Sequence, residues 1–235
     1  MMKSTVEQIR QRFDADVDRF SNLETGQSAT IDAPLVLDLI TAVAAATNPQ
    51  ATRSLDIGCG AGNYTLKLLA NLPNLAVTLI DLSAPMLERA VTRLGAVTAQ
   101  PISTVQGDIR DIEFEAESFD IIMAAAVFHH LRGDDDWRSV FAKCYTALKP
   151  GGSIWISDLI EHDSPAIQAL MWQRYGEYLM QLKGEAYRDT VYGYIEQEDT
   201  PRPLLWQLHM LKEAGFKTVE ILHKNSVFAA FGAIK

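Results

Sequence analysis

An acidic residue stands just before a glycine-rich turn, and this pairing is the first sign of a binding site. Residues 55–62 (LDIGCGAG) join a short apolar run to a segment with helical periodicity. Glycines permit positive φ angles and let the backbone approach a ligand closely. A dinucleotide site has the spacing G-x-G-x-x-G, whereas Gly58, Gly60 and Gly62 give G-x-G-x-G. Asp56 would also repel a pyrophosphate, so the turn favours a ligand that carries an ammonium or sulfonium group.

Two further acids stand at the ends of later predicted strands. Asp81 follows the apolar run 76–80, about 20 residues beyond the glycine turn, where an acid can accept hydrogen bonds from both ribose hydroxyls. Its alternative role is to stabilise the N-terminus of the next helix. Asp108 closes a third strand within residues 107–110 (GDIR), with a solvated loop acid as the alternative. Acids at three successive strand ends indicate a ligand site more specifically than any one of them does.

The pattern of Asp56 and the three glycines resembles the first motif, E/D-x-G-x-G-x-G, of the class I S-adenosylmethionine-dependent methyltransferases. The resemblance implies S-adenosyl-L-methionine as cofactor, since it carries both cationic groups and no phosphate, and S-adenosyl-L-homocysteine as product. It also implies roles for five residues: Asp81 on the ribose, Leu82 and Met86 beside the sugar and base, Asp108 on the adenine amino group, and Ile109 on the adenine ring. Core packing is the alternative for Leu82 and Met86, and a turn without a ligand is the alternative for the glycines.

Two histidines follow the fourth predicted strand, residues 119–125. Ala125 leaves room beside the methionine moiety of the cofactor, and His129 and His130 come next, at the sheet edge where open α/β folds bind ligands. We take His129 as the candidate catalytic residue that contacts the methyl acceptor, with a structural role as the alternative. Methyl transfer depends mainly on orientation, and a base helps only where the acceptor carries a proton. A strong catalytic constellation is therefore not expected.

The elements that must position these residues alternate between strand and helix. The patterns predict strands at 53–57, 76–80, 102–105, 119–125 and 153–157, with helices at 64–72, 84–94 and 134–148 between them. A last helix, 203–214, precedes two strands, 218–223 and 227–233, that are close enough to pair antiparallel. The fold class is α/β: a doubly wound, mostly parallel sheet. With its terminal hairpin it resembles the seven-stranded Rossmann-like methyltransferase core.

Segments outside this core are expected to cover the site. Residues 4–20 read as one helix, with a capping box formed by Ser4 and Glu7, and residues 34–46 read as a second helix. The resemblance implies that residues 1–48 lie over the cofactor, and packing on the sheet edge is the alternative. We expect one methyltransferase domain over residues 1–235, with residues 49–160 as its cofactor-binding core and residues 203–235 as its last helix and hairpin.

The helical insertion 164–200, which we call the lid segment, is rich in aromatic residues. It holds Trp172 and five of the seven tyrosines: Tyr175, Tyr178, Tyr187, Tyr192 and Tyr194. Aromatic walls with polar tips suit an apolar or planar acceptor, so Trp172, Tyr175 and Tyr192 are the candidate acceptor-binding residues beside His129. Docking of amphipathic helices is the alternative. Asp158 and His162, after the fifth strand, are expected to face the same rim.

Composition limits the partners and the location. The chain has 235 residues and a net charge of −9, and this disfavours a nucleic-acid partner. Cys59 and Cys144 make no disulfide framework, no metal-ligand spacing is present, and no apolar run reaches membrane-spanning length. We expect a cytoplasmic protein with a small-molecule acceptor, no bound metal and no membrane partner, and a homodimer as the candidate assembly.

The leading interpretation is transfer of a methyl group to a small-molecule acceptor by in-line displacement. Residues 107–112 (GDIRDI), 211–216 (LKEAGF) and the closing Phe228 to Phe231 strand also resemble carboxy-S-adenosylmethionine synthases and related wobble-uridine tRNA-modification enzymes. In that branch an arginine binds the carboxylate and an asparagine stands in strand four, whereas this chain has Tyr192 and Ala125. The alternatives from other functional classes are an NAD(P) oxidoreductase and a non-catalytic protein that binds a nucleoside cofactor.

Overall fold

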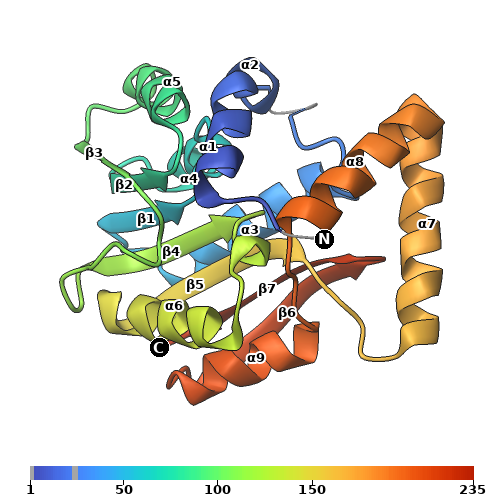
Figure 1. Cartoon of the computed structure of the whole chain (residues 1–235). Coiled ribbons are helices and arrows are strands. Elements are labelled where there is room, and N and C mark those ends of the chain that lie inside the picture. The colour runs from blue at the N-terminus through green and yellow to red at the C-terminus, as the bar shows by residue number, and fades with distance from the viewer. Residues whose placement is uncertain (1–2, 23–25) are drawn as a thin grey trace.

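A mixed sheet forms the centre of the molecule (Figure 1), in a computed structural model that describes residues 3–22 and 26–235. Its strand order is β3-β2-β1-β4-β5-β7-β6. The strands are β1 (Arg53–Ile57), β2 (Ala76–Asp81), β3 (Ile102–Gln106), β4 (Phe119–Ala125), β5 (Leu148–Leu159), β6 (Thr218–Asn225) and β7 (Phe228–Ile234). Strands β1 to β5 pair in parallel, whereas β7 pairs antiparallel with both β5 and β6. The chain order reverses between β1 and β4, so a crevice is expected at their carboxyl ends.

Helices cover both faces of the sheet, as the doubly wound prediction requires. One face carries α3 (Ala33–Thr47), α4 (Asn63–Asn71) and α5 (Ala84–Gly95), and the other carries α6 (Asp134–Ala147) and α9 (Leu204–Glu213). The strands between them are nearly continuous apolar runs, as strands buried on both faces usually are. Ser83 caps α5 as its position suggests, because its hydroxyl accepts a hydrogen bond from the Met86 N–H at 3.3 Å.

The seven-stranded α/β fold with its terminal hairpin is confirmed for the described residues, with three local differences. The strand predicted at 153–157 begins at Leu148, which the prediction gave to the preceding helix, because Leu148 already pairs with Phe119 of β4. The predicted helix 4–20 is two helices, α1 (Val6–Ala15) and α2 (Val17–Phe20), because Asp16 between them leaves the helical region of φ/ψ space. The capping box lies one residue further on than predicted: the Thr5 side chain accepts from the Gln8 N–H, and the Gln8 side chain accepts from the Thr5 N–H. The predicted Ser4–Glu7 box was therefore wrong.

Two helices of the lid segment stand beside the sheet rather than on either face (Figure 1). They are α7 (Pro165–Lys183) and α8 (Glu185–Glu198), and a turn at Gly184 joins them. Their aromatic side chains form a separate apolar cluster around Tyr175 and Leu179, against Leu159 at the end of β5. The end of α8 is thereby brought over the carboxyl end of the sheet.

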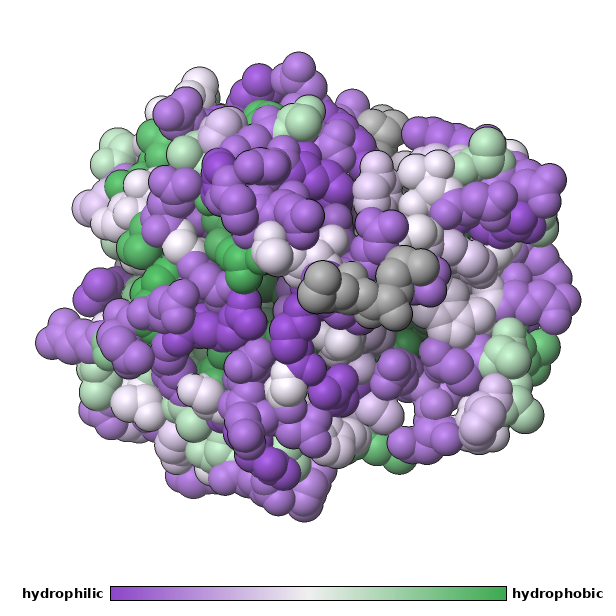
Figure 2. Space-filling view, in the orientation of Figure 1, coloured by the Kyte–Doolittle hydropathy of each residue, from purple (hydrophilic) through white to green (hydrophobic). Residues whose placement is uncertain are grey.

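The outer surface is mainly polar on the face shown in Figure 2, where hydrophobic residues appear only in scattered groups. No helix within the described parts of the chain is both long and apolar enough to cross a bilayer. Cys59 and Cys144 are both free and buried, which agrees with the absence of a disulfide framework.

Candidate active site

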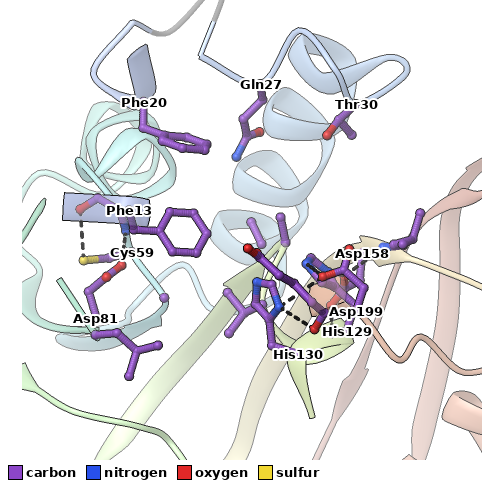
Figure 3. Close-up of a pocket in the computed structure, with 18 of the residues that line it drawn as sticks. Phe13, Phe20, Gln27, Thr30, Cys59, Asp81, His129, His130, Asp158 and Asp199 are labelled. Carbon is purple, nitrogen blue, oxygen red and sulfur yellow. Dashed lines mark hydrogen bonds and ion pairs between the residues drawn. The ribbon is translucent and has the colours of Figure 1, made fainter. Parts of the chain in front are cut away.

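A cavity of about 410 Å³ opens at the carboxyl ends of β1, β2, β4 and β5. Figure 3 shows Phe13 of α1, Phe20 of α2, and Gln27 and Thr30 above it, and α8 also contributes to its lining. Among the candidate cofactor- and acceptor-binding residues, those that line it are Asp56, Gly58, Gly60, Asp81, Leu82, Met86, Asp108, Ile109, Ala125, His129 and Tyr175. Gly62, Trp172 and Tyr192 are the candidates outside the lining. The fold thus brings together side chains from strands that are far apart in the sequence.

The glycine turn is shaped by close packing on one side and open space on the other. Gly58 has φ +63°, and a Cβ there would lie 2.2 Å from Cγ2 of Val127. Gly60 has φ +51°, and a Cβ added to it would meet no atom within 4 Å, so its backbone faces the cavity freely. Gly62 instead begins α4, and a Cβ there would meet Ala90 of α5 at 3.2 Å. Two glycines therefore shape the cavity, and the third permits helix packing.

Asp56 is a fully buried acid that accepts a short hydrogen bond from a hydroxyl. Thr65 donates to its Oδ2 at 2.6 Å. Burial raises the pKa of Asp56 to about 7, the nearby charge of Asp81 adds to the rise, and the Thr65 hydrogen bond opposes it. A carboxyl group in this state gains charge easily when a cation approaches, as the sequence predicted for a ligand with an ammonium group.

Asp81 links the glycine turn to the start of α5. Its Oδ2 accepts from the Gly60 N–H at 2.8 Å, and its Oδ1 accepts from the Ser83 N–H at 2.9 Å. Because a carboxylate has about four acceptor positions, each oxygen keeps one for a ligand hydroxyl. Leu82 and the buried Met86 line the cavity beside it.

Asp108 follows β3, the strand beside β2, and is paired with Arg110. The guanidinium donates to Oδ1 at 3.0 Å and to Oδ2 at 2.6 Å. Burial alone would raise the pKa of Asp108, but the hydrogen bonds from Arg110 outweigh it and lower the pKa below its ordinary value. Asp108 is therefore a fixed anion, and the neighbouring Ile109 presents a buried apolar side chain to the cavity.

A polar cluster lies at the opposite end of the cavity, in the loop after β4 and the segment after α8 (Figure 3). His129 and His130 belong to a short 3-10 helix, η1 (Phe128–His130). Nδ1 of His129 contacts Oδ1 of Asp158, while its Nε2 lies 3.6 Å from Oδ1 of Asp199. Nδ1 of His130 lies 3.1 Å from the same Asp199 oxygen. The two imidazoles and two carboxylates form one continuous group.

The charge state of His129 follows from its two acidic neighbours. Burial alone would lower its pKa, but the charges of Asp199 and Asp158 outweigh burial and raise the pKa to about 9. The pKa of Asp199 is lowered, because the two histidines outweigh its burial. Asp158 also accepts backbone N–H bonds from Phe128 at 2.8 Å and from Leu159 at 2.7 Å, so its position is fixed by the fold.

The lid segment contributes to the cavity differently from the prediction. Tyr175 lines it and donates its hydroxyl to the Ala29 carbonyl at 3.0 Å. Tyr192 donates instead to the Trp172 carbonyl at 2.5 Å, and both rings pack in the cluster behind Tyr175. Aromatic residues that the sequence analysis did not assign to the acceptor also line the cavity, among them Phe13 and Phe20 of the N-terminal helices and Tyr187 and Tyr194 of α8. The features of the sequence that could have indicated them are the apolar stripe of the N-terminal helix, for the two phenylalanines, and the aromatic content of α8, for the two tyrosines.

Asp199 was also missed in the sequence, and His162 lies elsewhere. Asp199 follows α8 as one acid among several, and only the fold brings it to the histidines. His162 is outside the cavity lining, where it contacts Gln168 and Lys224. Asp158, its companion in the prediction, does line the cavity.

The roof of the cavity is held by contacts between the N-terminal segment and the end of α8. Arg12 forms an ion pair with the buried Glu198 at 2.5 Å. The Ser4 N–H donates to the Gln197 carbonyl at 2.8 Å, and the Arg132 guanidinium donates to the Ser4 carbonyl at 3.0 Å. Two segments that are distant in the sequence therefore form one cover.

Comparisons with known proteins agree with this geometry. Residues 55–152 match the model of a methyltransferase domain. The chain is 30% identical over 187 residues to the carboxy-S-adenosyl-L-methionine synthase of Chromohalobacter salexigens, covering 77% of this chain and 67% of that protein. It is 28% identical over 176 residues to the demethylmenaquinone methyltransferase of Staphylococcus aureus, covering 73% of this chain and 70% of that protein.

A solved structure resembles nearly the whole chain. The 1,6-didemethyltoxoflavin-N1-methyltransferase of Burkholderia thailandensis, with its substrate and S-adenosylhomocysteine bound, matches with a TM-score of 0.65 at 16% identity, covering 100% of this chain and 92% of that one. The matched domain, the curated relatives and the acids around the glycine turn lead to one conclusion. The chain belongs to the class I S-adenosylmethionine-dependent methyltransferases and uses S-adenosyl-L-methionine as its cofactor.

Proposed function

We propose that the enzyme methylates a small-molecule acceptor held between the lid segment and His129. The observation that supports this most strongly is the continuity of the cavity, which joins the glycine turn to the His129 cluster without an intervening wall. Cofactor and acceptor can therefore lie end to end, as in-line displacement requires.

The cofactor end fits S-adenosyl-L-methionine in shape and charge. Asp81 keeps free acceptor positions for the ribose hydroxyls, and Ile109 and Asp108 form an apolar surface and an acceptor for the adenine. Gly60 exposes its backbone beside Asp56, whose carboxyl suits the cationic amino-acid end. When bound, the cofactor supplies a methyl group on a positively charged sulfur, an electrophile that needs no further activation.

The acceptor end combines aromatic walls with a charged polar floor. Phe13, Phe20 and Tyr194 come from the roof, and His129 lies beneath them. Because Asp158 occupies Nδ1 of His129, its Nε2 is the nitrogen that can meet the acceptor. A pKa of about 9 keeps this imidazole charged at neutral pH. His129 would therefore orient and stabilise an oxygen with negative charge rather than remove a proton.

The carboxy-S-adenosylmethionine synthase activity named for one relative is less well supported. Tyr192 lies outside the cavity lining, and each arginine described in the lining is already close to an acid. Arg12 pairs with Glu198, Arg110 with Asp108, and Arg19 with Asp16. A carboxylate on the cofactor would have to displace one of these partners.

The test is to identify the ligand that purifies with the protein and then to measure turnover. Native mass spectrometry should show S-adenosyl-L-methionine or S-adenosyl-L-homocysteine, and a mass raised by one carboxylate would favour the synthase instead. Release of S-adenosyl-L-homocysteine is then followed across panels of phenols, enols and nitrogen heterocycles. Binding of cofactor without turnover of any panel member or of cell-extract metabolites would support the non-catalytic alternative.

A further inference from the structure

The two histidines and Asp199 have a geometry that the methyl-transfer proposal does not explain. One ring nitrogen of His129, one ring nitrogen of His130 and one carboxylate oxygen of Asp199 all lie within 4.8 Å of one another. No other group of three or more His, Cys, Asp or Glu side chains within the described parts of the chain brings its ligand atoms so close together. We propose that these three side chains bind a divalent transition-metal ion.

The distances from the Asp199 oxygen to the two imidazole nitrogens fit one shared ion. A first-row metal lies about 2.1 Å from imidazole nitrogen and carboxylate oxygen, so two ligand atoms are about 3.0 Å apart at a right angle and about 3.4 Å apart at a tetrahedral angle. The Asp199 oxygen lies 3.1 Å from Nδ1 of His130 and 3.6 Å from Nε2 of His129. The nitrogens of the two histidines lie within 4.8 Å of each other, and they would move to about 3.0–3.4 Å apart to share an ion.

The surroundings of His129 also suit a metal ligand. Histidines that bind metals usually donate their other ring nitrogen to a carboxylate, which fixes the ring and its tautomer. Asp158 contacts Nδ1 of His129, and its side chain is fully buried and held by backbone N–H groups. With Asp199, it supplies two negative charges around a dication. Asp158 is thus a positioning residue behind the first ligand.

The position of the cluster indicates what such an ion would do. Three protein ligands with further coordination positions open to a cavity are typical of catalytic rather than structural sites. All three side chains line the cavity, on the side where the acceptor is proposed to bind. With the ion bound, Nε2 of His129 would carry no proton and would coordinate the metal, so the ion instead of the imidazole would meet the acceptor. The ion would coordinate an acceptor hydroxyl, ideally one beside a second oxygen, and lower its pKa so that its proton leaves to solvent. This inference rests on the proposed function for its acceptor, though the metal site itself does not.

The experiment measures metal binding directly, apart from activity. The protein is stripped with a chelator and titrated with Co²⁺, which is followed by its visible absorption, and with Zn²⁺, which is followed by calorimetry. We expect one equivalent of each ion to bind. His130→Ala and Asp199→Asn should each weaken binding at least about tenfold, and Asp158→Asn should weaken it about 10- to 100-fold although it is not a ligand.

Controls separate this site from adventitious binding. His209→Ala, on the exposed face of α9, should leave the affinity unchanged. Thiolate charge-transfer bands with Co²⁺ would indicate binding at a cysteine and would overturn the assignment. The assignment would also be overturned if the unaltered protein bound no metal. It would be overturned equally if His130→Ala and Asp199→Asn bound the metal as tightly as the unaltered protein does. The affinity of each variant for S-adenosyl-L-methionine is measured by calorimetry, because retained cofactor binding shows that the variant is folded. If the protein binds and turns over the cofactor but binds no metal, only this inference is contradicted and the proposed function stands.

Discussion

Asp56 makes a prediction that links stability to cofactor binding. Folding raises its pKa, so the folded protein keeps a proton that the unfolded chain has already lost. The free energy of unfolding that this group contributes should therefore fall as the pH rises from about 4 to about 7, and level off above that. Asp56→Asn imitates the protonated acid and keeps an oxygen for the Thr65 hydroxyl, so it should lack this fall.

The magnitude follows from the two pKa values. A rise from 3.8 to about 7 corresponds to roughly 4 kcal/mol at 1.36 kcal/mol per unit. Urea unfolding of the cofactor-free protein and of Asp56→Asn across this pH range measures the difference, because other titrating groups affect both proteins alike. Above neutral pH the variant should be the more stable of the two and should bind S-adenosyl-L-methionine more weakly. Parallel stability curves would refute the assignment of this pKa to Asp56.

Three further predictions concern the cavity. Asp81→Ala removes an acceptor whose charged hydrogen bonds contribute about 1.5–3 kcal/mol each, so calorimetry should show cofactor affinity weakened at least about tenfold. Gly58→Ala places a methyl group 2.2 Å from Val127 at φ +63°, and thermal unfolding should show a loss of several kcal/mol, roughly 3 or more. Glu198→Gln breaks the pair with Arg12 in the roof, and limited proteolysis should cleave the N-terminal helices faster.

Matched variants keep these outcomes interpretable. Gly60→Ala shares the positive φ of Gly58 but meets no neighbouring atom, so it should cost only the backbone strain of roughly 1–2 kcal/mol. Equal losses at the two glycines would contradict the packing argument. Glu185→Gln breaks an exposed pair with Arg188 and should leave the proteolysis rate unchanged. If it accelerates cleavage as much as Glu198→Gln does, the roof contact has no special role.

The sequence predicted the sheet well because its strands are short apolar runs between turn residues. The bounds of β1 to β4 were placed to within one residue, but β5 begins five residues earlier than predicted. The hairpin of β6 and β7 followed from the closeness of two such runs. The N-terminal helix was misjudged at Asp16, where the apolar stripe continues although the backbone breaks. Periodicity records which side of a segment is buried, and a single non-helical residue between two short helices does not disturb it.

The site was predictable only where a motif stands at a strand end. Asp56, Asp81 and Asp108 line the cavity because parallel strands place their carboxyl ends at one edge. Asp199 and Phe13 reach the same cavity from distant segments. Nothing in its local sequence marks Asp199, and the apolar stripe that contains Phe13 does not tell a cavity-lining side chain from a packed one. Trp172 and Tyr192 were chosen for residue type, but which face of a helix turns to the cavity depends on how α7 packs against α8.

The two-part roof has a consequence for how such an enzyme can diversify. The recognised methyltransferase domain spans residues 55–152, whereas Arg12 and Glu198, which clamp the roof, lie on either side of that range. Substitutions that reshape the acceptor chamber can therefore accumulate in the flanking segments without disturbing the cofactor cradle. Because each half of the clamp constrains the other, such changes should occur as coordinated pairs across the roof, and grafting one half from a relative should fail unless the other half accompanies it.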